Sequence, residues 1–387
     1  MKKRRRGNRN FLLLAIAVFC LNVGFGVYFA TFNNFIVERI GIKPEQLGFM
    51  EALRETPGFL SAAFNALVSI ISAPVVGGIS LIVMGFGIGS YSQVHTLLWL
   101  VLFSLIWSIG FHGWAPLQGT MALAFSEEGR KGERLGQLRS VGGFAYLFGL
   151  LLAISVSLID YSGVYLLAGM IIALGGVTIL FASWNRDGIR ETRFLFRQKY
   201  GIYYALNFLQ GCRKQIFVVF AVFTLVKVYG ISVQTVITLM VINQIVTILT
   251  GPLMGRLVDR YGERRMLSLS YLGLTFVFAG YALIHNPKIL FVCYCLDNLL
   301  YFGSIALTTY INRIAPPQDI RPTLSMGVTM NHVAAILTPL FGGLLWEAFS
   351  YEVIFAGGAF VALISLLVSR MIPPDHGTPM GLPSRPC

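Results

Sequence analysis

Long apolar runs, separated by short polar stretches, fill the chain from residue 11 to residue 371. A helix needs about 20 apolar residues to cross a bilayer, and the runs have that length. The alternation of apolar and polar residues typical of membrane strands is absent. The pattern predicts an all-α polytopic membrane protein with twelve transmembrane helices at 11–31, 46–71, 74–92, 95–125, 139–158, 162–183, 202–228, 231–253, 266–284, 288–311, 322–346 and 352–371.

The composition agrees with a chain embedded in lipid. Of its 387 residues, 56% are hydrophobic and only 12% are charged, whereas soluble domains carry roughly 25% charged residues. Its 41 glycines suit close packing of helices in a membrane. Four of the five cysteines lie inside apolar runs and the fifth ends the chain, so neither a disulfide framework nor a metal site is predicted. No cofactor is expected.

The basic residues gather on one side of the predicted helices. With the N-terminus inside, 23 of the 30 lysines and arginines fall on the inner side, four on the outer side and three within the membrane. Basic residues favour the cytoplasmic side, so both termini are predicted to be cytoplasmic, in a multi-pass protein of a prokaryotic inner or plasma membrane. The same bias explains the net charge of +13 without a nucleic-acid partner.

A charged stretch from Gly255 to Arg265 separates two of the apolar runs. It reads Gly-Arg-Leu-Val-Asp-Arg-Tyr-Gly-Glu-Arg-Arg. Two glycines seven residues apart suit a tight reversal of the chain, and ionised side chains are costly in hydrocarbon. The four arginines place the predicted turn at the cytoplasmic surface.

This stretch resembles the loop signature of the major facilitator superfamily, Gly-x-Leu-x-Asp-Arg-Phe/Tyr-Gly-x-Arg-Arg/Lys, at eight positions. The alternative is a generic basic turn between two membrane helices. The resemblance implies two six-helix bundles, at 11–183 and 200–371, joined by a cytoplasmic linker at 184–199. A basic tail at 1–10 and a second tail at 372–387 flank them. The residues that the resemblance assigns to a cytoplasmic gate are Gly255, Asp259, Arg260, Gly262, Arg264 and Arg265.

The chain departs from the superfamily pattern in its first half. A shift of 189 residues superposes the two halves and maps Gly255 and Asp259 onto Ala66 and Ile70, within an apolar stretch. If the charged turn acts as a latch at the cytoplasmic side, only the second bundle therefore carries a polar one.

Three ionisable residues lie inside the second predicted helix. Glu51, Arg54 and Glu55 are spaced by three and four residues, which places them on one helical face. Pro57 follows and is expected to kink the helix. One interpretation is a self-neutralising structural triad. The other is a carboxylate that exchanges a proton while Arg54 keeps the other acid ionised, since two acids cannot share one arginine equally.

A second charged group is predicted near the middle of the membrane. Arg213 and Lys214 lie in the seventh helix, and Asp297 lies at a similar depth in the tenth. The three residues form either a structural ion pair or, because two cations face one acid, a site for an anionic substrate. Secondary transporters bind substrates at this depth.

Further candidates for substrate binding or coupling are Asn22, Trp114 and His332. A buried amide is also a common hydrogen-bonding link between membrane helices. Trp114 shares a helical face with Trp107 and Phe111, where the rings either stack on a substrate or pack together. His332 is the side chain best suited to titrate near neutral pH.

No phosphate-binding loop, His-Glu-x-x-His motif or Gly-x-Ser-x-Gly motif occurs, so the chain is not predicted to be an enzyme. We expect a monomeric secondary active transporter that moves a small solute, such as an organic anion, by alternating access, with a proton or sodium as coupling ion. The superfamily resemblance implies a cavity lined by helices one, four, seven and ten. The alternatives are a proton-driven exporter of amphipathic compounds and a non-transporting membrane sensor or assembly protein.

Overall fold

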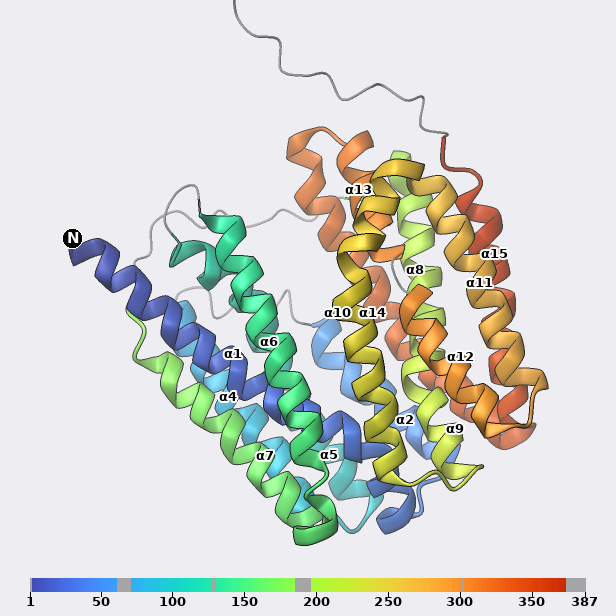
Figure 1. Cartoon of the computed structure of the whole chain (residues 1–387), viewed down its shortest axis with the longest axis horizontal. Coiled ribbons are helices and arrows are strands. Elements are labelled where there is room, and N and C mark those ends of the chain that lie inside the picture. Colours follow the sequence, from blue (N-terminus) through green and yellow to red (C-terminus); the bar gives the residue numbers. More distant parts are fainter. Residues whose placement is uncertain (1, 61–70, 127–129, 185–195, 301–302, 374–387) are drawn as a thin grey trace, which may run out of the picture. The chain divides into compact units, whose positions relative to one another are not determined.

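The computed structural model describes residues 2–60, 71–126, 130–184, 196–300 and 303–373. These residues are mostly helical and none lies in a strand (Figure 1). Ten helical segments among them are long and apolar enough to cross a membrane. The predicted all-α polytopic fold is therefore confirmed. The count of twelve helices stays a prediction, because residues 61–70 and 301–302, which fall in two of the predicted helices, lie outside the described residues.

The helices follow the apolar runs of the sequence. Their bounds are α1 Lys2–Phe35, α2 Pro44–Phe59, α4 Ala73–Gly89, α5 Leu97–Ala124, α6 Lys131–Ala153, α7 Val156–Leu180, α8 Gly201–Ile216, α9 Val222–Lys227, α10 Val233–Tyr261, α11 Glu263–Leu283, α12 Pro287–Leu300, α13 Gly303–Ile314, α14 Pro317–Ala348 and α15 Tyr351–Ser369. Short π-helical turns extend α1 to Ile40 and connect α8 with α9.

The chain divides into two compact units. Helices α8, α10 and α14 contribute residues to both units. The two six-helix bundles at 11–183 and 200–371, which the superfamily resemblance implies, stay a prediction. Unit 1 comprises Met1–Glu191, Gln215–Ile245 and Ala335–Tyr351, and unit 2 comprises Thr192–Lys214, Val246–Ala334 and Glu352–Cys387.

Unit 1 is held together by helices that approach closely at glycines. Gly85 of α4 and Gly169 of α7 face each other, and a Cβ on Gly85 would lie 2.8 Å from the backbone nitrogen of Ala173. Gly26 of α1 and Gly149 of α6 meet in the same way, since a Cβ on Gly26 would lie 2.8 Å from the Cα of Gly149. Small residues permit this contact between backbones, which favours helix association in lipid.

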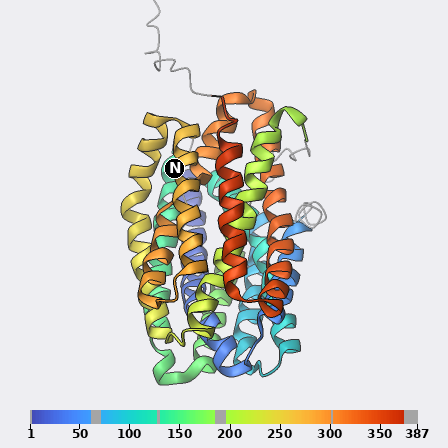
Figure 2. The same cartoon turned by 90° about the vertical axis from the view of Figure 1, so that its right-hand side faces the viewer.

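Unit 2 packs around aromatic and aliphatic side chains of α8, α11, α13 and α15. Its core includes the buried Tyr200, Tyr271 and Tyr310. Tyr281 of α11 stacks on Phe355 of α15 with ring centroids 4.5 Å apart. Figure 2 shows α15 (red) running nearly parallel to its neighbours in this unit.

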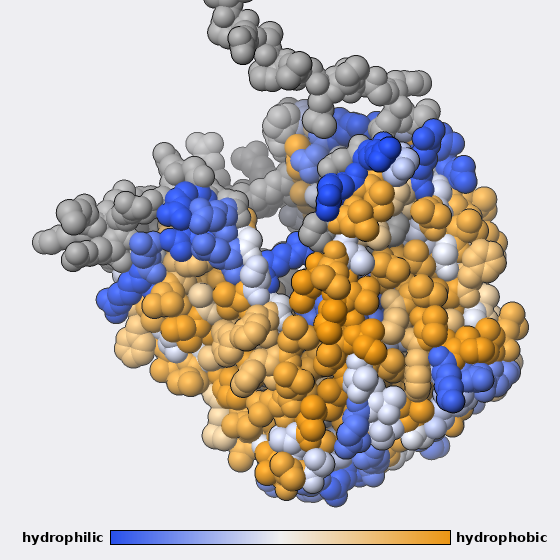
Figure 3. Space-filling view, viewed as in Figure 1, coloured by the Kyte–Doolittle hydropathy of each residue, from blue (hydrophilic) through white to orange (hydrophobic). Residues whose placement is uncertain are grey.

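The outer faces of the helices carry exposed apolar side chains. In unit 2, Leu249, Phe276 and Val292 are each more than half exposed, and Figure 3 shows hydrophobic residues over the middle of α10, α11 and α12 with hydrophilic residues near the helix ends. Apolar surface of this extent suits a hydrocarbon solvent.

Two local boundaries differ from the prediction. Helix α1 begins at Lys2, so the backbone of the predicted basic tail is helical, because Lys and Arg are good helix formers. The predicted turn at 255–265 is shorter than expected: α10 continues to Tyr261 and α11 begins at Glu263. Only Gly262 interrupts the helices, with a φ of 79° that glycine adopts without strain.

Candidate functional site

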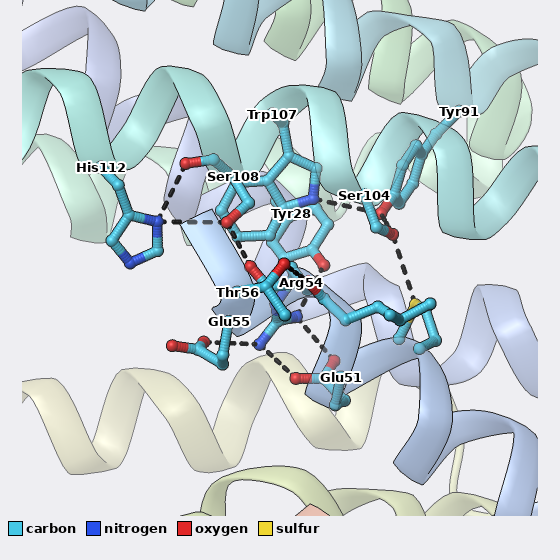
Figure 4. Close-up of polar contacts among 12 residues, drawn as sticks. Tyr28, Glu51, Arg54, Glu55, Thr56, Tyr91, Ser104, Trp107, Ser108 and His112 are labelled. Carbon is cyan, nitrogen blue, oxygen red and sulfur yellow. Dashed lines mark hydrogen bonds and ion pairs between the residues drawn. The ribbon is translucent and has the colours of Figure 1, made fainter. Parts of the chain in front are cut away.

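Glu51, Arg54 and Glu55 of α2 form one largely buried cluster in unit 1 (Figure 4). Arg54 Nη1 donates to Glu51 Oε1 over 2.6 Å, and Nη2 contacts the second carboxylate oxygen of Glu51. Nη2 also lies 3.7 Å from Glu55 Oε1. The spacing of three and four residues along a helix brings these side chains to one face, as the sequence predicts.

The two carboxylates of this cluster are not equivalent. Glu51 is almost completely buried and contacts the guanidinium of Arg54 through both oxygens. The side chain of Glu55 is 16% exposed and lies farther from the guanidinium. Two carboxylates beside one guanidinium leave an excess of one negative charge when both are ionised, and Glu55 is the more accessible of the two.

Helix α5 presents one face to this cluster. Trp107 lies over the guanidinium of Arg54, with 5.2 Å between the guanidinium carbon and the ring centroid, which is a cation–π contact. The indole nitrogen of Trp107 donates to the hydroxyl of Tyr91 over 3.2 Å. From α1, the hydroxyl of Tyr28 accepts a hydrogen bond from Arg54 over 3.4 Å. Arg54 is thus held by an acid, an aromatic face and a hydroxyl.

Pro57 disturbs the backbone of α2 beside the cluster. Proline has no N–H, so the carbonyl of Leu53 loses its helical donor. The hydroxyl of Thr56 donates to that carbonyl over 2.7 Å. The next carbonyl, that of Arg54, accepts a hydrogen bond from the hydroxyl of Ser108 on α5. The Thr56 hydroxyl therefore compensates the carbonyl that lacks its donor at the proline, and the Ser108 hydroxyl links the same turn to α5.

His112 adjoins the cluster from one turn farther along α5. Its Nδ1 lies 2.9 Å from the carbonyl oxygen and 3.1 Å from the hydroxyl oxygen of Ser108. A ring nitrogen of His112 and a carboxylate oxygen of Glu55 lie within 4.8 Å of each other. No single-sequence pattern drew attention to Ser108 or Tyr28, because neither is unusual in a membrane helix.

In unit 2, the predicted ion pair at depth is present. Arg213 Nη1 of α8 donates to Asp297 Oδ1 of α12 over 2.7 Å, and both side chains are buried. The adjacent Lys214 is half-buried, as expected for neighbours that point about 100° apart on a helix. His332 is half-buried on α14 of the same unit.

Two other candidates have contacts that suit packing. Asn22 donates to the carbonyl of Val18 in its own helix over 2.7 Å. Trp114 is completely buried, and a Cβ on Gly77 of α4 would lie 3.1 Å from its ring. Its neighbour Trp107, one of the aromatic residues that share its helical face, is the one that contacts the charged cluster.

The gate stretch is described in part. The surroundings of Gly255 and the side chain of Asp259 lie outside what the structure describes. Arg260 lies over the ring of Tyr261, 5.5 Å from its centroid, while Arg264 is half-buried and Arg265 is exposed. Glu263, next to Gly262, is buried and pairs with Arg313 over 3.2 Å. Glu263 occupies a variable position of the signature, so the motif alone did not mark it.

The sequence pattern did not predict a role for another buried acid, Asp319, which precedes the membrane-spanning part of α14. Asp319 is 2% exposed and accepts a hydrogen bond from the hydroxyl of Tyr200 over 2.7 Å. Arg197 and Lys199 lie 3.1 and 3.2 Å from the same oxygen. The Tyr200 hydroxyl, with Lys199 and Arg197, holds the pKa of Asp319 below its ordinary value.

Known proteins resemble this chain over part or most of its length. A model of the Major Facilitator Superfamily matches residues 203–385. A multi-drug resistance efflux pump PmrA homolog of Lactococcus lactis is 24% identical over 80% of this chain and 83% of its own. A Na⁺, Li⁺, K⁺/H⁺ antiporter of Planococcus maritimus is 26% identical over 35% of this chain and 32% of its own.

Solved structures show the same fold. The nucleoside transporter NupG has a TM-score of 0.77 at 16% identity, over 93% of this chain and 98% of its own. A bacterial homolog of the human lysosomal transporter Spinster has a TM-score of 0.74 at 14% identity, over 95% and 98%. The fold and the family matches define a helical membrane transporter, not an enzyme. Residues 203–385 of the chain thus match the major facilitator superfamily, and the protein is a multi-pass protein of the plasma membrane.

Proposed function

We propose that this transporter exports amphipathic organic compounds in exchange for protons. The observation that carries the proposal is the position of Glu55, a partly exposed carboxylate 3.7 Å from an arginine that Glu51 already neutralises. Such a carboxylate can gain and lose a proton without breaking the Glu51–Arg54 pair. Ionisable groups inside a membrane commonly mark proton pathways.

The proton changes the charge of the cluster. With Glu55 ionised, Glu51, Arg54 and Glu55 carry one net negative charge, and with Glu55 protonated they carry none. A neutral cluster is cheaper to enclose in a low-dielectric protein interior than a charged one. Protonation of Glu55 therefore favours the states in which the cluster is shielded from water, and a bound cation can take the place of the proton.

Aromatic side chains next to the cluster support an amphipathic substrate. Phe25 and Phe29 of α1 and Phe111 of α5 are half-buried. Phe25 contacts Trp107 and Phe111 with centroid distances of 6.2 and 5.5 Å. Partly exposed rings beside a negative group suit a ligand with a flat apolar part and a positive charge.

The names of two relatives agree with this class of substrate and ion, since one is a multi-drug efflux pump homolog and the other a cation/proton antiporter. The alternative of a small organic anion depends on surplus positive charge beside Asp297. The names of these two relatives give it no comparable support.

The proposal is tested with purified protein in liposomes that carry a pH gradient, loaded with a fluorescent amphipathic cation. Wild-type protein is expected to move the cation only when the gradient is present. Glu55→Gln resembles the protonated acid, so it is expected to bind the cation more weakly and to lose the dependence of transport on the gradient. Glu133→Gln, which removes an exposed carboxylate paired with Arg130 on α6, is the matched control and should behave as wild type.

A sodium gradient in place of the pH gradient separates the two coupling ions. Transport driven by sodium alone, or an unchanged pH dependence in Glu55→Gln, would overturn the proposal. Uptake of organic anions with no movement of cations would instead support the alternative substrate.

A further inference from the structure

We propose that Ser108 is a positioning residue that fixes the height and direction of Glu55 through the backbone of α2. This inference rests on the proposed role of Glu55. Ser108 lies on α5 and is 1% exposed, and its hydroxyl is the described group that reaches across to the carbonyl of Arg54, next to Glu55 in the chain. Figure 4 shows it between His112 and α2.

The directions of the hydrogen bonds follow from the chemistry of the partners. A carbonyl oxygen only accepts, so the 2.9 Å contact between Nδ1 of His112 and the carbonyl of Ser108 requires a proton on Nδ1. The same N–H also faces the hydroxyl oxygen of Ser108 over 3.1 Å. The hydroxyl then accepts from His112, and its own proton is directed to the carbonyl of Arg54.

The carbonyl of Arg54 follows directly after the carbonyl of Leu53, which loses its helical donor at Pro57. The helix is locally weakened there, since proline removes one hydrogen bond and its ring crowds the preceding turn. Thr56 compensates the carbonyl of Leu53 from within α2, whereas Ser108 donates to the carbonyl of Arg54 from a different helix. The direction in which α2 continues past Arg54 therefore depends on α5.

Glu55 lies within this locally weakened turn. Loss of the Ser108 hydroxyl would remove the hydrogen bond that ties this turn of α2 to α5, and the turn would be free to shift. The 3.7 Å separation between Glu55 and Arg54, which sets how strongly the cation favours the ionised acid, would change with it. Among the described residues of unit 1, Arg54 of α2 and His112 of α5 lie near Glu55, while Glu51 of α2 and Tyr28 of α1 contact Arg54.

The test compares Ser108→Ala with Ser104→Ala in the liposome assay. Ser104 is on the same helix and equally buried, but its hydroxyl contacts Tyr91 and the sulfur of Met50 rather than the backbone of α2. Displacing a reacting group by about 1 Å can reduce rate up to about 100-fold. We expect Ser108→Ala to lower turnover within that range and to shift the pH midpoint of transport, with little change in KM for the cation. Ser104→Ala should leave the pH midpoint in place.

Two further variants separate positioning from a general loss of folding. Ser108→Thr keeps the hydroxyl and should restore the wild-type pH midpoint. Pro57→Ala returns the missing N–H to α2, so its effect on the midpoint should not add to that of Ser108→Ala, as expected for residues that act through one structure.

The outcomes distinguish this inference from the proposed function. If Glu55→Gln abolishes proton coupling but Ser108→Ala shifts the pH midpoint no more than Ser104→Ala, the inference is wrong and the function stands. Additive effects of Pro57→Ala and Ser108→Ala would also overturn it. If Glu55→Gln retains coupling, the proposed function fails first.

Discussion

At the scale of single residues, two buried arginines meet different surroundings. Arg54 lies between two carboxylates, under an indole ring and beside a tyrosine hydroxyl. Arg213 donates to one acid, Asp297, on a neighbouring helix. A buried cation needs such partners because the loss of hydration is not otherwise compensated. Beside Arg54, one of the two carboxylates can exchange a proton while the other keeps its ion pair. Arg213, in contrast, donates to a single carboxylate.

The Arg213–Asp297 pair gives the first prediction. Asp297→Asn should destabilise the protein by about 3–5 kcal/mol, because it leaves a buried guanidinium without a charged partner. Replacing both residues, as Arg213→Met with Asp297→Leu, should recover most of the stability. Thermal unfolding of detergent-solubilised protein measures both effects. A purely structural pair predicts that the double variant also transports normally, whereas loss of transport with normal stability assigns the pair to substrate or coupling.

Asp319 gives a prediction about pH. Its pKa is lower in the folded protein than its ordinary value, so its ionised form stabilises the fold above the unfolded pKa. This stabilisation is lost as the pH falls through the lower, folded pKa. The difference in melting temperature between wild type and Asp319→Asn should therefore be largest near neutral pH and shrink below about pH 4.

Asp160→Asn is the matched control for Asp319→Asn. Asp160 pairs with Arg39, and both side chains are about half exposed. Exposed ion pairs contribute little to stability, so this variant should melt close to wild type across the pH range. An equal loss of stability in both variants would argue against a special role for the Asp319 contacts.

At the scale of helices, glycines decide how closely the elements of unit 1 approach. Gly48 of α2 faces Gly343 of α14, and a Cβ on Gly343 would lie 2.5 Å from the carbonyl oxygen of Pro44. A contact that short forces backbone atoms apart. In contrast, a Cβ on Gly119 of α5 meets no described atom within 4 Å.

Gly343 and Gly119 form a matched pair for mutation. Gly343→Ala should destabilise the protein or shift its conformational equilibrium, because overpacking of a close contact costs about 1–3 kcal/mol. Gly119→Ala should be neutral or slightly stabilising, since alanine favours a helix by up to about 1 kcal/mol over glycine. Melting temperature and transport rate are the measurements. Equal effects at both positions would contradict a close α2–α14 contact.

At the scale of the whole molecule, the bias of basic residues predicts both termini inside. In a variant without its native cysteines, a cysteine at Asn286, between α11 and α12, should react with an impermeant thiol reagent added outside intact cells. A cysteine at Arg370, after α15, should react only when the membrane is opened. The reverse pattern would invert the predicted topology.

Much of the architecture follows from the sequence alone, because hydrocarbon is a simple solvent. Apolar runs of the length of the bilayer must form helices that satisfy their own backbone groups, so the all-α polytopic fold was predictable. The charged signature from Gly255 to Arg265 indicated the superfamily for a similar reason, since its ionised side chains need a membrane surface. The helical spacing that brings Glu51 and Glu55 to Arg54 is a local property, so it could also be predicted from the sequence.

The tertiary structure decided what surrounds those charges. Ser108 donates to the carbonyl of Arg54, and Trp107 covers the guanidinium of Arg54. Asp319 contacts Tyr200, Arg197 and Lys199. These contacts depend on segments that are distant in the chain. Serine and tryptophan are ordinary residues in membrane helices, and only packing fixes their partners. The sequence thus determined which groups must be compensated inside the membrane, and the packing determined which neighbours compensate them, because hydrogen bonds between helices depend on rotation and depth that no local spacing specifies.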